Sequence, residues 1–162
     1  MVMGTTMIGN GRTSRLGSTP GTGHGASVPL DRVLLSPWGD VHSRTGDFTI
    51  DNQAAELILQ AYADHAVDLV IDYEHATLGE QYASPDGLAP ASGWVERLEA
   101  VPRVGLFGLV AWTANGQRKI DTGEYRYISP VVLVRKADGR AVALHSVALT
   151  NRPAIPNMPR LR

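Results

Sequence analysis

The sequence predicts an α+β domain built on an antiparallel, barrel-like β-sheet with one or two flanking helices. Segments 94–112 and 125–150 each have the composition of a β-hairpin, because apolar and β-branched residues flank a short polar turn. Segment 105–112 is apolar on both faces, as expected of a strand buried in a barrel. Segment 51–64 instead repeats its apolar residues at helical spacing, which indicates a helix.

The composition limits the classes of protein to which the chain can belong. Its 162 residues, 43% of them hydrophobic, fit one globular domain with an ordinary core. A net charge of −1 gives no electrostatic reason to expect nucleic acid or an anionic membrane as a partner. The absence of cysteine excludes disulfides and thiolate metal sites and fits a reducing cytoplasm. No run approaches the ~18 apolar residues of a membrane span, so we expect neither a membrane protein nor a secreted one.

The domain organisation follows from the distribution of small residues and prolines. Residues 1–27 are rich in Gly, Ser and Thr and cannot bury enough surface to offset the entropy of ordering them, so we expect a disordered tail. The folded domain is expected to cover residues 28–156. Prolines after Asn151 cannot continue a central strand, and residues 157–162 are predicted to form a C-terminal tail.

The first half of the domain is predicted to contain strands at 28–35, 48–50 and 69–71 around one helix. Ser36 and Pro37 are expected to end the first strand, and turn residues follow at 38–40. The helix has Asp51 as its N-cap and an apolar stripe. This stripe comprises Ala54, Leu57, Ile58, Ala61 and Tyr62. Segment 78–91 contains several glycines and prolines and is predicted to be a loop.

The second half is predicted to hold the two hairpins and a short helix from Thr113 through Ile120, ended by Gly123. Pro130 interrupts the first strand of the second hairpin and removes one donor from the ladder. We therefore expect an edge, a bulge or a kink beside Ser129, and such a distortion could expose its hydroxyl.

Ser129 and His75 are the residues with the clearest chemical potential, because each lies on a strand-like segment of one domain. A serine hydrolase presents its nucleophile and its base in this way. An imidazole can take the serine proton and return it to the leaving amine near neutral pH. Isolated residues of either type more often serve packing or capping, so the spacing alone leaves both readings open. Strand alternation places Tyr127, Ser129 and Val131 on one face, which must turn toward His75 if the two residues react together.

Five motifs extend this pattern across most of the chain. They are Asp72-Tyr73-Glu74-His75, Ala91-Ser92-Gly93-Trp94-Val95, Ala111-Trp112-Thr113, the segment 123–130 and the segment 148–154. In order and spacing, from about Pro37 to Ile155, they resemble the Mu-like phage I proteins, which are head-maturation proteases. The resemblance implies an assemblin-like fold and a serine endopeptidase with Ser129 as nucleophile and His75 as general base, needing no cofactor.

The same resemblance implies a setting and partners. The substrates would be the phage scaffold and major head proteins, with self-cleavage included, inside the immature capsid in the host cytoplasm. A homodimer is plausible by analogy with the assemblins.

The sequence leaves the third catalytic position open. A pattern resembling x-Val-Ala/Ser-Leu in the assemblin-like group places Ser146 there by register, whereas His145 has the better chemistry for orienting a base. Adjacent strand residues face opposite sides, so both can point at His75 only if a bulge intervenes. Asp72 ranks behind them, since ideal alternation puts it on the face opposite His75.

Two other functions compete with the protease. A non-catalytic head-assembly or scaffold-linked module with the same fold would keep the motifs without the chemistry. A metal-dependent hydrolase would use oxygen and imidazole ligands, but no known ligand spacing is present. The residues available for it are Asp72, Glu74, His75, His42 and His145.

Overall fold

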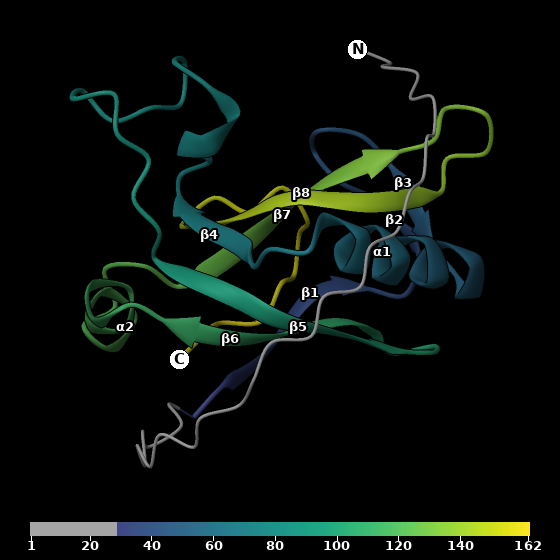
Figure 1. The fold of residues 1–162 in the computed structure, drawn as a ribbon, viewed down its shortest axis with the longest axis horizontal. Helices are drawn as coiled ribbons and strands as arrows, with labels where there is room; N and C mark the ends of the chain where they lie inside the picture. Colours follow the sequence, from purple (N-terminus) through teal and green to yellow (C-terminus); the bar gives the residue numbers. More distant parts are fainter. Residues whose placement is uncertain (1–28) are drawn as a thin grey trace, which may run out of the picture.

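The computed structural model describes residues 29–162, so the tail predicted at 1–27 lies outside the described residues. The eight strands, two α-helices and one short 3-10 helix of the described residues are drawn in Figure 1. They are β1 (Asp31–Pro37), β2 (Gly39–Val41), β3 (Phe48–Ile50), α1 (Asn52–His65), β4 (Leu69–Tyr73), the 3-10 helix η1 (Ala76–Leu78), β5 (Gly93–Val101), β6 (Gly105–Trp112), α2 (Ala114–Asp121), β7 (Tyr127–Val134) and β8 (Ala141–Thr150).

The main sheet has the strand order β1-β6-β5-β4-β8-β7 and curls into a half barrel (Figure 1). Both predicted hairpins, β5–β6 and β7–β8, are present, and the predicted α+β class is confirmed. The sheet is antiparallel as predicted except at one place, where β4 and β8 pair in parallel. These two strands are far apart in the chain, so no tight turn fixes their relative direction.

The hydrophobic core takes side chains from most strands of the main sheet and from α1. The helix buries Ala54, Ala55 and Ile58 and packs mainly against β8. The predicted N-cap is confirmed, since Asp51 Oδ1 accepts a hydrogen bond from the Ala54 amide at 2.9 Å. At the other end of the helix, the Tyr62 hydroxyl donates to the Val95 carbonyl at 2.9 Å. In the part of the chain that the structure describes, no helix is long and apolar enough to cross a membrane.

Ser92 connects α2 to the end of β4. Its carbonyl accepts the Thr113 amide at 2.9 Å, and its own amide donates to the Ile71 carbonyl at 2.6 Å. A Cβ atom on Gly116 would lie 2.0 Å from the Ser92 oxygen, so only glycine allows α2 to pack this closely. The first turn of α2 is therefore fixed against the residue that holds β4.

The predicted element boundaries need two corrections. The first strand begins at Asp31 and continues through Ser36 and Pro37, which were expected to end it. Proline is tolerated there because β1 is an edge strand and its outer side needs no ladder donor. Gly39 and Asp40 were expected in a turn at 38–40, but they pair with β3 as part of β2. At the other end of the chain, Met158 is buried in the core and the Leu161 amide donates to the Arg126 carbonyl at 2.9 Å.

Candidate active site

The end of β4 carries a tight turn that determines where His75 lies. Glu74 and His75 both adopt left-handed backbone conformations, with φ of 53° and 63°. Such conformations cost about 1–3 kcal/mol each for residues other than glycine, and they persist only where surrounding contacts enforce them. His75 is thus outside the strand, and simple alternation with Asp72 does not apply to it.

Asp72 lies in one row with the candidate nucleophile. It pairs with Ala148 across β4 and β8, and Ala148 pairs with Ser129 across β8 and β7. Paired residues present their side chains on the same face, so Asp72 and Ser129 share a face two strands apart, roughly 10 Å between Cα atoms. The turn after Tyr73, where β4 ends, places His75 at the end of the sheet that holds this row.

Ser129 is fully buried, with a relative exposure of 0%. Its hydroxyl oxygen accepts a hydrogen bond from the Ala154 amide at 3.2 Å, and the Ala154 carbonyl in turn accepts the Arg44 amide at 2.9 Å. The expected exposure beside Pro130 is therefore absent. Pro130 lies on the edge strand β7, as one of the predicted alternatives required, and the nearest register shift comes later, between Val131 and Val132.

The His75 imidazole has an unsatisfied nitrogen. Its Nδ1 atom is buried and has no hydrogen-bond partner among residues 29–162, and the ring lies edge-on to Tyr82 with centroids 6.5 Å apart. Within the same residues no hydrogen bond joins His75 to Ser129, whose hydroxyl oxygen accepts the Ala154 amide. A hydroxyl with a proton to donate and a ring nitrogen without a partner are chemically complementary.

A bulge brings the two leading candidates for the third position together. Ser146 pairs with Val131 and Leu144 pairs with Val132, so His145 is the extra residue of β8. The His145 Nδ1 atom lies 3.1 Å from the Ser146 hydroxyl oxygen. Ser146 is fully buried on the face shared by Ala148, whereas His145 is exposed. The bulge that would allow Ser146 and His145 to face the same side of β8 is therefore present.

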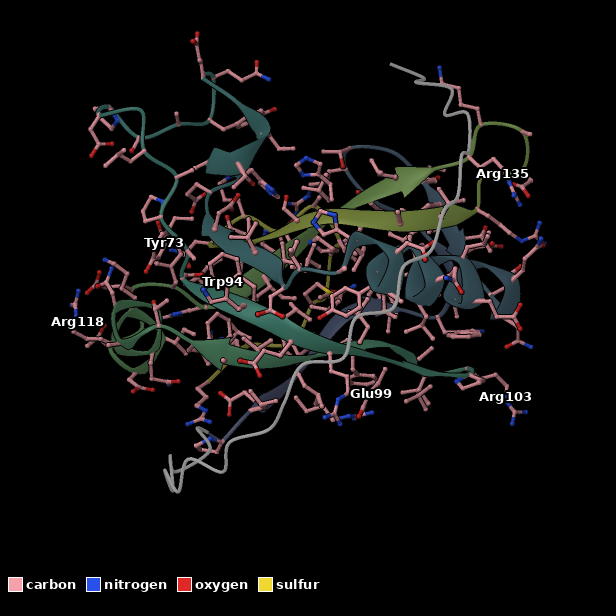
Figure 2. The ribbon with its side chains drawn as sticks, viewed as in Figure 1. Tyr73, Trp94, Glu99, Arg103, Arg118 and Arg135 are labelled. Carbon is pink, nitrogen blue, oxygen red and sulfur yellow. The ribbon has the colours of Figure 1, made fainter. Side chains whose placement is uncertain are left out.

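Asp72 makes contacts of a different kind from those of an acid that orients an imidazole. Its carboxylate accepts hydrogen bonds from the amides of His75 and Thr77, at 3.1 and 2.9 Å, and from the Thr77 hydroxyl. Tyr73 lies between Asp72 and the turn but points away from them, toward α2 (Figure 2). Its hydroxyl accepts a hydrogen bond from Asn115 Nδ2 at 3.1 Å.

The acidic side chain beside His75 is tied to β8. Glu74 Oε2 accepts a hydrogen bond from the Thr150 hydroxyl at 3.0 Å, and the Glu74 amide donates to the Leu149 carbonyl at 3.1 Å. Burial raises the pKa of Tyr125, and the negative charge of Glu74 raises it further. Tyr125 remains the neutral phenol at physiological pH and can donate a hydrogen bond near the turn.

The residues weighed for a metal site are not assembled into one. Within residues 29–162, no group of three or more His, Asp and Glu side chains is placed to hold a metal ion. His42 Nδ1 instead lies 3.0 Å from Asp47 Oδ2 at the surface, and His145 faces Ser146.

Comparison with known proteins places these residues in a family. The model of the family described as Mu-like prophage I protein, N-terminal domain, matches residues 33–162. The chain belongs to this family. Protease I of Escherichia phage Mu is 35% identical over 124 residues, covering 75% of this chain and 34% of the phage protein. The Mu-like prophage FluMu I protein of Haemophilus influenzae is 30% identical over 139 residues, covering 78% of this chain and 39% of that protein.

The Mu-like relatives are longer than this chain, which spans about a third of the length of the two proteins it matches. No solved structure gives a significant match. The resemblance that the five sequence motifs predicted is confirmed, and those motifs meet in space. For example, Gly93 pairs with Trp112, whose ring leaves no room for a Cβ atom at position 93.

The sequence did not predict the roles of three residues of the site. Thr77 could have been found, because an Asp followed by a short turn often accepts hydrogen bonds from amides a few residues on. Ala154 and Thr150 lie in the motif 148–154, but local pattern gave them no role, since their contacts with Ser129 and Glu74 join distant parts of the chain.

Proposed function

We propose that the chain is the protease domain of a phage head-maturation protein and acts as a serine endopeptidase. The observation that supports this proposal most is the row Asp72, Ala148 and Ser129, because the strand that bears Ser129 and the turn that bears His75 lie at the same end of the sheet. Membership of the Mu-like I protein family supports it, as does the name Protease I given to the phage Mu relative.

The mechanism follows the general scheme for acyl transfer. Ser129 Oγ attacks the peptide carbonyl while His75 takes the hydroxyl proton, and His75 then returns this proton to the departing amine. In the second half of the reaction, His75 takes a proton from water, the water attacks the acyl-enzyme, and the proton returns to Ser129. Backbone amides would stabilise the oxyanion, and the amide that donates to the Ser129 hydroxyl oxygen in the structure is that of Ala154. The Ala154 segment has to shift before a substrate carbonyl can reach the buried hydroxyl.

The proposed substrates are the scaffold and major head proteins of the phage, with self-cleavage included. The reaction would take place inside the immature capsid in the host cytoplasm, and the protein would act as a homodimer. No nucleic acid, membrane or cofactor has a role in this proposal. Because the chain spans only a third of its Mu-like relatives, these partners belong to the whole protein as much as to this domain.

One observation favours a second candidate, a non-catalytic head-assembly module. Ser129 is 0% exposed, and no hydrogen bond connects it to His75 within the described residues. A module of this kind would use the same fold for assembly contacts and leave the hydroxyl permanently covered.

A fluorophosphonate probe separates the two functions, because it labels only a serine that can act as a nucleophile. We expect slow but complete labelling of the folded protein, with the adduct mapped by mass spectrometry to Ser129. Heat-denatured protein serves as the control and should not react. If folded protein stays unlabelled after prolonged exposure, the protease proposal fails and the assembly module remains.

We propose that the Ser146 and His145 pair occupies the third position, with Asp72 in another role. If the hydrogen-bonded pair orients His75, Ser146→Ala and His145→Ala should each slow labelling by about 10- to 100-fold. The double variant should be no worse than the more damaging single one, since both changes break one connection. Additive effects, or near-normal rates in all three variants, would mean that the pair does not serve His75 and that the enzyme works as a Ser-His dyad.

A further inference from the structure

We infer that Asp72 and Thr77 are positioning residues, which direct the His75 imidazole by holding the backbone turn between β4 and η1. This inference rests on the proposed function of His75 as a base. Asp72 is fully buried at the end of β4. One carboxylate oxygen accepts the His75 amide at 3.1 Å, and the other accepts the Thr77 amide at 2.9 Å and the Thr77 hydroxyl.

These contacts tie the chain on both sides of the imidazole. The amide of His75 and the amide two residues later bind the same carboxylate, so the backbone that bears the ring is held at two points. The left-handed conformations of Glu74 and His75 require such restraint, because without it both residues would relax to commoner backbone angles. A further restraint comes from Ser92, whose hydroxyl donates to the Ile71 carbonyl at 3.0 Å.

Asp72 acts on the chain rather than on the ring. Among the described residues, every hydrogen bond that its carboxylate accepts comes from a backbone amide or from the Thr77 hydroxyl, and none comes from an imidazole nitrogen of His75. Among the ion pairs of the described residues, none involves Asp72, so a cation does not explain its burial. The hydrogen bonds from the turn therefore account for the burial of the Asp72 carboxylate.

Amide hydrogen exchange tests the turn independently of catalysis. Asp72→Asn replaces one acceptor oxygen by a donor nitrogen, so the His75 or the Thr77 amide should exchange at least about tenfold faster than in the natural protein. Thr77→Val removes only the hydroxyl and should give a smaller increase, whereas Thr77→Ser keeps the hydroxyl and should restore slow exchange. The Thr77 variants also keep the test decisive if Asp72→Asn fails to fold. Unchanged exchange in Asp72→Asn and Thr77→Val would overturn the inference.

Labelling by the fluorophosphonate probe tests the link to chemistry. Asp72→Asn should slow labelling of Ser129 by about 10- to 100-fold, as expected when a reacting group is displaced by about 1 Å. In a His75→Ala protein supplied with free imidazole, the same change should have no effect, because a free base is not held by the turn. A loss that persists with free imidazole would show that Asp72 acts elsewhere. If natural protein is never labelled while the exchange rates change as expected, the proposed protease fails and the turn restraint stands.

Discussion

Replacing Ser129 by alanine is expected to eliminate covalent labelling and to lower peptide cleavage by a factor on the order of 10⁶, since no other group can form the acyl-enzyme. Cleavage would be measured with an internally quenched peptide library, and labelling with the fluorophosphonate probe. The same substitution leaves the Ala154 amide without its acceptor, which costs about 1–3 kcal/mol of unfolding free energy. Thermal unfolding must therefore accompany the activity measurement.

Ser36→Ala is the matched control for this experiment. Ser36 is also a fully buried strand serine, and its hydroxyl donates to the Pro37 carbonyl at 3.0 Å. It lies on β1, outside the row on β4, β8 and β7 that holds Ser129. The Ser36→Ala variant should lose a comparable amount of unfolding free energy, and its Ser129 should be labelled at the natural rate. Equal loss of labelling in Ser36→Ala and Ser129→Ala would indicate that activity follows stability, and residual labelling of Ser129→Ala would assign the nucleophile to another residue.

The parts of the fold that depend on local pattern were predictable from the sequence. The helix α1 follows from the Asp51 cap and its apolar stripe, and the hairpin β7–β8 follows from the Asp138-Gly139 turn between two apolar strands. The parallel pairing of β4 with β8 was not predictable in this way, because it joins segments that share no turn.

The candidate site shows the same division. Ser129 and His75 could be named from their motifs, but the burial of Ser129 depends on Ala154, a contact between distant segments that no local pattern records. Strand alternation opposed Ser146 to His145, and the bulge that unites them becomes visible only in the pairing of β7 with β8. The left-handed turn at Glu74 and His75 likewise has hydrogen bonds that sequence spacing does not specify, from the His75 amide to Asp72 and from the Glu74 amide to Leu149.

Removal of the His75 imidazole is expected to have the second largest effect. His75→Asn suits this test, because asparagine tolerates the left-handed backbone conformation that position 75 adopts and so leaves the turn in place. Labelling of Ser129 and peptide cleavage should fall by about 10²- to 10⁴-fold, the usual contribution of a positioned general base. The free energy of unfolding should change little, since the buried Nδ1 atom of His75 has no partner to lose.

Chemical rescue distinguishes a base from a structural histidine. In His75→Ala, added imidazole can enter the space left by the side chain and take the Ser129 proton, so labelling should rise with imidazole concentration. His65→Gln, an exposed change in the last turn of α1, is the control and should retain the natural rate and show no response to imidazole. If His75→Asn labels at the natural rate, or if imidazole fails to restore any labelling in His75→Ala, then His75 is not the base, whatever the fate of Ser129 as nucleophile.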